Sequence, residues 1–198
     1  MSITSENTFE TAIIESLLKT GGYTEGNAND YSPELGMFKA EVLHFLRDSQ
    51  PRQWDKLAAI HGDDVENRLI QRLYKEMDLR GALDVIRNGI VDYGVRFKMA
   101  LFKPESGLNP DPLALYEQNR LKVIRQVYYS KKNTNSVDLI LSLNGLPVAT
   151  LELKNRFTGQ NTVHAKRQYA VPATIKSCCL HLKNAPWCIL PWMMKRST

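Results

Sequence analysis

Two aliphatic runs on either side of Asn144-Gly145 constrain the fold of this chain more than any other feature of its sequence. They span residues 137–154, in which leucines recur at every second position over several residues. Asn-Gly between two such runs is a strong β-hairpin signal, because both residues tolerate the positive φ angles of a tight turn. The charged residues Asp138, Glu152 and Lys154 interrupt the apolar pattern. Buried charges are costly unless they are paired or bind a metal, so these three need an explanation.

The apolar pattern also predicts the register of this hairpin. One face of each strand carries three aliphatic residues: Leu139, Leu141 and Leu143 on the first, and Ala149, Leu151 and Leu153 on the second. Directly opposed residues lie on the same face, so matching the two faces requires paired numbers with an even sum. A two-residue turn would pair 143 with 146, an odd sum. We therefore predict a three-residue loop or a glycine bulge at Gly145, which sets Asp138 opposite Glu152, with Lys154 one pleat further along.

Length and composition point to one globular domain with a real core. The chain has 198 residues, of which 43% are hydrophobic and 24% charged, as in an ordinary soluble protein. No apolar run approaches the ~20 residues that span a bilayer, and the N-terminus has no signal-peptide pattern, so we expect a cytoplasmic protein. No Walker-type phosphate loop is present, so we expect no ATP site in this chain.

Hydrophobic periodicity predicts an α+β fold in which a helical N-terminal region, residues 1–92, precedes a mixed β-sheet flanked by helices, residues 93–169. Helices are expected at 9–18, 34–47, 54–60 and 65–86, the last with a possible break at Gly81. Strands are expected at 93–97 and at 121–129, where Arg125 should point outward. A loop at 103–112, short helices at 113–119 and 162–169, and the central hairpin complete the pattern.

The charged residues of the hairpin suit phosphodiester hydrolysis. Mg²⁺ prefers one or two carboxylates and keeps water and substrate phosphate as its other ligands, and Asp138 and Glu152 fit that role. The backbone carbonyl of Leu153 could add a ligand, and Lys154 could orient or deprotonate a water, or neutralise the phosphate. The pattern by itself is loose. A salt bridge between Glu152 and Lys154 on an exposed face explains the same residues without any catalysis.

A resemblance to a known family extends over residues 6–169. The chain resembles the PD-(D/E)xK nuclease core and, more closely, the N-terminal domain of the R (restriction and translocation, HsdR) subunit of type I restriction enzymes. The segments that carry it are Phe9-Glu10, Gly21-Gly22-Tyr23, Phe102-Lys103-Pro104, Ser106-Gly107-Leu108-Asn109-Pro110, Asn119-Arg120-Leu121, Val137-Asp138-Leu139, Leu143-Asn144-Gly145-Leu146-Pro147-Val148-Ala149, Glu152-Leu153-Lys154-Asn155, Thr158-Gly159-Gln160 and Arg167-Gln168-Tyr169.

The resemblance implies a restriction-endonuclease-like fold and a nuclease site made of Asp138, Glu152 and Lys154, with Asp138 and Glu152 as Mg²⁺ ligands. It implies support from Gln168-Tyr169 on the next helix, and from a glutamate of the first helix. Glu10 matches that glutamate better than Glu15, although by itself either residue reads as solvated helix charge.

For the intact protein the resemblance implies ATP-dependent translocation and cleavage of double-stranded DNA, in complex with modification and specificity subunits. The alternative is a catalytically inactive remnant, or a DNA- or protein-docking module. A Holliday-junction or repair nuclease with the same core is disfavoured by the length of the match.

The resemblance stops after Tyr169, and residues 170–198 have an unusual composition. They contain four basic residues and no acidic one, so they supply +4 of the net charge of +5 and leave +1 (5 − 4) for the rest. Three cysteines lie there without metal-ligand spacing. Read one base earlier, permitted codons for this segment give an amphipathic, strand-like continuation. We therefore predict that residues 170–198 are an aberrant tail translated out of frame, and that the chain is a truncated fragment.

Overall fold

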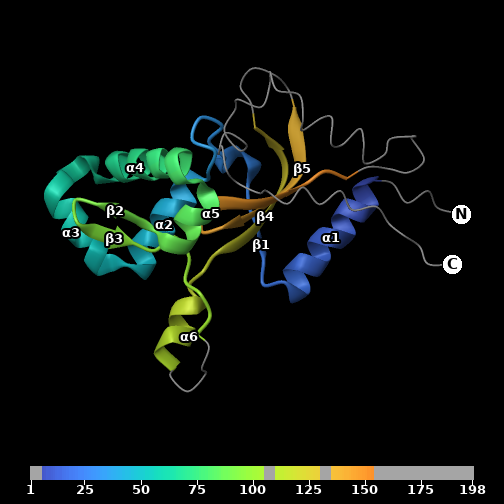
Figure 1. Cartoon of the computed structure of the whole chain (residues 1–198). Helices are drawn as coiled ribbons and strands as arrows, with labels where there is room; N and C mark the ends of the chain where they lie inside the picture. The colour runs from blue at the N-terminus through green and yellow to red at the C-terminus, as the bar shows by residue number, and fades with distance from the viewer. Residues whose placement is uncertain (1–5, 105–109, 130–134, 154–198) are drawn as a thin grey trace, which may run out of the picture.

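The computed structural model describes residues 6–104, 110–129 and 135–153, and its centre is a mixed four-stranded sheet (Figure 1). The strands lie in the order β1-β4-β5-β6; β1 is parallel to β4, and the other pairs are antiparallel. Their bounds are β1 Thr24–Glu25, β4 Leu121–Tyr128, β5 Ser136–Leu143 and β6 Leu146–Leu151. The predicted α+β class with a mixed sheet is confirmed.

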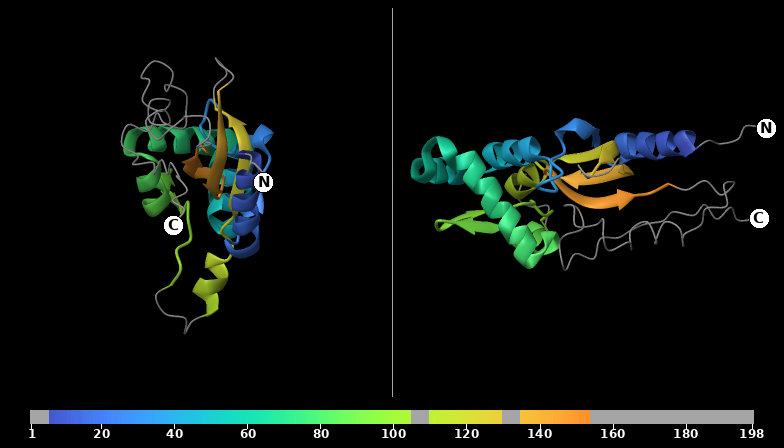
Figure 2. Two further views of the ribbon diagram at one scale, coloured as in Figure 1. Left: turned by 90° about the vertical axis from the view of Figure 1, so that its right-hand side faces the viewer. Right: turned by 90° about the horizontal axis from the view of Figure 1, so that it is seen from above.

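Helices cover the sheet unequally. The N-terminal helix α1, Glu6–Thr20, packs through Ile14 against Val123, Leu139 and Leu153 of the sheet. The opposite face is covered near the 3-10 helix η1, Ala28–Asp30, by Tyr31 and Phe38. Helices α2 to α5 gather at one end of the sheet, and α1 lies toward the other end (Figures 1 and 2).

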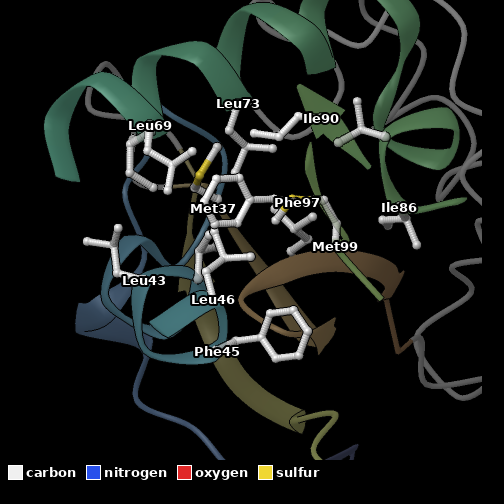
Figure 3. Close-up of a cluster of buried hydrophobic side chains, with 14 of the residues drawn as sticks. Met37, Leu43, Phe45, Leu46, Leu69, Leu73, Ile86, Ile90, Phe97 and Met99 are labelled. Carbon is white, nitrogen blue, oxygen red and sulfur yellow. The ribbon is translucent and has the colours of Figure 1, made fainter. Parts of the chain in front are cut away.

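The largest hydrophobic cluster belongs to the helical end of the molecule. It joins α2 Lys39–Ser49, α3 Pro51–His61, α4 Val65–Arg80 and α5 Ala82–Asn88 to a small hairpin of β2 Ile90–Asp92 and β3 Val95–Phe97. Figure 3 shows its centre, where side chains from these elements and from the segments beside them meet: Met37, Leu43, Phe45, Leu46, Leu69, Leu73, Ile86, Ile90, Phe97 and Met99. The helices α1, α3 and α4, and the break at Gly81, lie where the periodicity predicts them.

Three predicted element boundaries are wrong. The second helix begins at Lys39 and not at residue 34, because Ser32 forms a β-bridge with Met37 and the chain turns before the helix. Tyr93 and Gly94 do not belong to a strand: both have positive φ and form the turn between β2 and β3. The helix α6, Pro110–Tyr116, begins three residues before the predicted 113.

In the central hairpin, the pairs furthest from the turn have the predicted even-sum register, but the extra residue that produces it is not at the predicted position. Asn144 and Gly145, at φ +53° and +83°, form a two-residue turn that pairs Leu143 with Leu146. An irregularity between Leu141 and Ser142 then shifts the register, and Leu141 pairs with Ala149. The predicted loop or bulge at Gly145 is therefore wrong, and the extra residue is Val148 on β6, between Pro147 and Ala149.

The division into residues 1–92 and 93–169 stays a prediction of domain organisation. Strand β1 comes from the first part, and it joins the sheet of the second part by pairing with β4. The helix predicted at 162–169 and the tail at 170–198 lie outside the described residues.

Candidate active site

Asp138 lies at the end of the hairpin far from the turn, next to the last paired residues of β5 and β6. Leu139 pairs with Leu151, so Asp138 and Glu152 follow at the next position on each chain. The backbone N–H of Leu153 donates a hydrogen bond to Asp138 Oδ2, with an N–O distance of 2.6 Å. The register and this hydrogen bond place Asp138 beside Glu152, as the sequence predicts. We refer to this region as the open end of the hairpin.

Glu152 and Leu153 follow β6 directly and are both buried. Their side chains are 7% and 2% exposed. Leu153 packs in the cluster under α1, which holds the backbone of this segment against the sheet. A carboxylate as buried as that of Glu152 is stable only with partners, and it does interact with its surroundings. This excludes an exposed position for Glu152, which the non-catalytic interpretation of the Glu152–Lys154 pair required.

A third carboxylate, Glu10, reaches the sheet from α1. Glu10 is 7% exposed, and its Oε1 lies 3.9 Å from Nε of Arg125 on β4. Arg125 Nε also lies 3.5 Å from Oε1 of Glu25 on β1. Arg125 pairs with Leu139, the residue after Asp138, so this charged cluster lies close to the open end in the sheet. Nε of Arg125 is buried, and no described residue accepts a hydrogen bond from it.

The two glutamates of the first helix have different surroundings. Glu15 is exposed and forms a surface ion pair with Lys19 one turn along α1, with an N–O distance of 3.4 Å. Glu10 lies on the side of α1 that faces the sheet. The interpretation of Glu10 as solvated helix charge is therefore wrong, whereas it holds for Glu15.

Sequence reasoning missed two residues near the open end. Arg125 was expected to point outward, but it faces α1 and meets Glu10; the signal that could have indicated this is its alternation with Val123, which packs under the same helix. Gln126 has a left-handed backbone with φ +48°. No sequence signal marks Gln126, because glutamine rarely adopts that conformation.

The polar groups at the open end are oxygen donors of the kind that Mg²⁺ prefers. Asp138 uses Oδ2 for the Leu153 N–H, and Oδ1 makes no hydrogen bond with a described residue. No group of three or more His, Cys, Asp or Glu side chains in the described ranges is arranged to hold a metal ion. Two carboxylates are a set that Mg²⁺ commonly takes from a protein, with water and phosphate oxygens as its other ligands, so Asp138 and Glu152 suit such a site in their chemistry. The predicted site residues Lys154, Gln168 and Tyr169 lie outside the described residues.

Burial also shifts the pKa of a tyrosine near the hydrophobic cluster of Ile14, Val123, Leu139 and Leu153 under α1. Tyr23, which follows α1, packs against the same hydrophobic cluster. Burial raises the pKa of its phenol above the ordinary value, because the charged phenolate is poorly solvated there.

The fold and the paired acids define a class: an α+β protein whose mixed sheet carries carboxylates at the open end of a hairpin, beneath an N-terminal helix. A family model described as the type I restriction enzyme R protein N terminus matches residues 3–175. The chain therefore belongs to this family and is the N-terminal region of a type I restriction enzyme R subunit. No curated protein and no solved structure matches the chain significantly. None of the helices in the described residues is both long and apolar enough to span a membrane.

Proposed function

We propose that this chain is the nuclease domain of a type I restriction R subunit, and that it hydrolyses DNA phosphodiester bonds with Mg²⁺ bound by Asp138 and Glu152. The observation that carries the proposal is the hydrogen bond from the Leu153 N–H to Asp138 Oδ2. It brings a strand-borne aspartate beside a buried glutamate on a family-matched hairpin. A pair of acids at one point of a rigid sheet suits the binding of a hard cation and a phosphate.

Each residue of the proposed site has a role that its chemistry allows. Asp138 and Glu152 bind the metal, with the backbone carbonyl of Leu153 as a further oxygen ligand. When bound, Mg²⁺ lowers the pKa of a coordinated water and polarises the phosphate. Lys154 orients or deprotonates the attacking water, or neutralises phosphate charge. Glu10 supports the site from α1, and Gln168 and Tyr169 have the supporting role that the family resemblance implies.

The partners in this proposal follow from the family. The substrate is double-stranded DNA, and the intact subunit works in a complex with modification and specificity subunits in the cytoplasm. Cleavage in the intact subunit depends on ATP, which we expect to bind outside this chain. DNA recognition is assigned to another subunit, so cleavage by this chain alone should show no sequence preference.

The experiment uses the purified 198-residue chain and supercoiled plasmid DNA. We expect Mg²⁺-dependent nicking that is lost in Asp138→Asn and Lys154→Ala and retained in Glu15→Gln, whose side chain is exposed on the outer side of α1. Calorimetric titration with Mn²⁺ should show binding to the wild type and at least tenfold weaker binding to Asp138→Asn. A folded sample that neither nicks DNA nor binds Mn²⁺ would contradict the proposal and would favour an inactive remnant or a docking module.

A further inference from the structure

The ladder between β4 and β5 is interrupted at one place, directly opposite Asp138. Pairing is regular on both sides: Arg125 pairs with Leu139, and Val127 pairs with Val137. The position between them, Gln126 opposite Asp138, is unpaired. Gln126 has φ +48°, which only glycine, asparagine and aspartate adopt readily. The interruption therefore comes from the backbone of β4 and not from a loop or a strand end.

Both strands change face at this interruption. In a regular strand, side chains two apart share a face, and side chains three apart do not. Here Ile124 and Val127, three apart on β4, lie in the same buried cluster, and so do Val137 and Ile140 on β5. Leu139 lies in the other cluster, under α1. Val137 and Leu139 thus point to opposite faces, and Asp138 between them lies at the crossover.

The position of Asp138 at the crossover accounts for its hydrogen bond. A strictly alternating β5 would direct Asp138 to the face of Ile140, whereas the change of face places it between that face and the face that α1 covers. At the crossover the Asp138 carboxylate instead reaches the backbone N–H of Leu153. This contact ties Asp138 to the backbone of the residue that follows Glu152.

The side chain of Gln126 does not explain its conformation. It is exposed, and among the described residues its Oε1 accepts a hydrogen bond from Ser136 Oγ, at 3.3 Å. A weak surface contact of this kind does not offset a left-handed backbone in the middle of a strand. Strained backbone that is not explained by local packing is typical of functional sites, where the surrounding structure maintains it.

We propose that Gln126 is a positioning residue for Asp138: its left-handed backbone breaks the β4–β5 ladder and thereby turns the Asp138 carboxylate toward the backbone N–H of Leu153. Only one part of this proposal, the effect of Gln126 on metal binding, rests on the proposed function. The geometric part concerns the backbone of Gln126 and the Asp138–Leu153 hydrogen bond, and it can be tested without any metal.

Two substitutions separate the backbone of Gln126 from its side chain. Gln126→Gly removes the side chain but keeps, and relieves, the left-handed conformation. Gln126→Val disfavours that conformation strongly, because a β-branched residue is a genuine outlier there. Tyr128→Val is the matched control on the same strand, since Tyr128 is exposed and pairs regularly with Ser136. Circular dichroism should show that all three variants fold.

The first readout is the hydrogen exchange of the Leu153 amide, measured by NMR without metal. We expect exchange to be faster by about tenfold in Gln126→Val, because one hydrogen bond is lost, and unchanged in Gln126→Gly and Tyr128→Val. The second readout is Mn²⁺ affinity, which should fall by about tenfold in Gln126→Val alone. Faster exchange in Gln126→Gly, or full protection in Gln126→Val, would overturn the proposal. If exchange follows the expected pattern but even the wild type fails to bind Mn²⁺, the positioning role stands and the proposed metal site fails.

Discussion

The two ends of the β5–β6 hairpin differ in their polar groups and in how those groups are hydrogen-bonded. At the closed end, the Asn144-Gly145 turn is buried: Asn144 is 0% exposed, and its polar groups make four hydrogen bonds. At the open end, Asp138 and Glu152 lie beside a broken ladder and a strained residue, Gln126. One hairpin thus has an end whose turn asparagine is buried and hydrogen-bonded, and an end that carries two carboxylates.

The closed end joins four segments of the chain. Asn144 binds the backbone of Arg120 through its own N–H and through Oδ1, and its Nδ2 donates to the Met99 carbonyl and to Asn119 Oδ1. The carbonyl of Gly145 accepts a hydrogen bond from the N–H of Phe38, which precedes α2. The buried hydrogen bonds of Asn144 and Gly145 make the closed end a structural anchor.

The difference between the ends explains where chemistry is possible. A satisfied, closely packed turn has no free polar group for a ligand. The open end has a carboxylate oxygen without a hydrogen bond to any described residue, and a second, buried carboxylate beside it. The rigid anchor at one end supports a precise but strained arrangement at the other. Substitutions at the closed end should therefore cost stability, whereas those at the open end should mainly affect the site.

The largest loss of stability is expected for Gly145→Ala. A Cβ at this position would lie 2.6 Å from the Val42 nitrogen and 2.8 Å from the Phe38 carbonyl oxygen, at φ +83°. We expect the free energy of unfolding in urea to fall by about 3–4 kcal/mol, from left-handed strain plus overpacking. Gly94→Ala is the matched control: its φ is +79° but no atom lies within 4 Å, so a loss of only about 1 kcal/mol is expected. Equal losses would show that the closed end is not tightly packed.

Asn144→Ala should have the next largest effect. It removes three side-chain hydrogen bonds and leaves buried partners, such as the Met99 carbonyl, unsatisfied. We expect a loss of about 2–3 kcal/mol in urea denaturation. The control is Asn88→Ala, at an exposed asparagine that donates to Asp84, with a loss within about 0.5 kcal/mol. A small effect at Asn144 would remove the distinction between the two ends.

The ion pairs between α2 and β4 should make stability near the closed end depend on pH. Burial raises the pKa of Glu41, but Lys122 and Arg120 outweigh it through hydrogen bonds and charge, so the pKa lies below its ordinary value of 4.5. Because the folded pKa is lowered, this stabilisation is present above pH 4.5 and is lost as the pH falls through the folded pKa.

Glu41→Gln should therefore lower the free energy of unfolding at pH 7 by on the order of 1 kcal/mol. The difference from the wild type should shrink below pH 4.5. Urea denaturation across this range measures both. Glu15→Gln is the control, because the Glu15–Lys19 pair is a surface pair. A difference that does not change with pH would contradict the ionic origin.

The smallest effect is expected at the open end, between Glu10 and Arg125. Their 3.9 Å separation is too long for a hydrogen bond, and Arg125 is shared with Glu25. A double-mutant cycle with Glu10→Gln and Arg125→Gln should give a coupling energy of about 0.5 kcal/mol in urea denaturation. A coupling above about 2 kcal/mol would show a direct, buried hydrogen bond and a second anchor at this end.

Much of this fold was predictable because its signals are local. The Asn144-Gly145 turn, the alternating leucines and the break between α4 and α5 at Gly81 each depend on residues close in sequence. The even-sum register was predictable too, because a slip by one residue would turn the leucines of β5 away from the core. The same reasoning placed Asp138 beside Glu152. The roles of Lys154, Gln168 and Tyr169, and the origin of residues 170–198, remain predictions.

Only the tertiary structure determines where the extra residue of the hairpin lies and which side chains surround its open end. The extra residue could not lie at Gly145, since the turn packs against the backbone of Phe38 and Val42 and leaves no space there. The pairing of Arg125 with Glu10 depends on α1 and β4, which are more than a hundred residues apart in the chain. The left-handed Gln126 opposite Asp138 belongs to the ladder between β4 and β5. Local patterns specify which residues form strands and turns. Contacts between distant elements decide where strain and charge are placed, because only the packed fold brings them together.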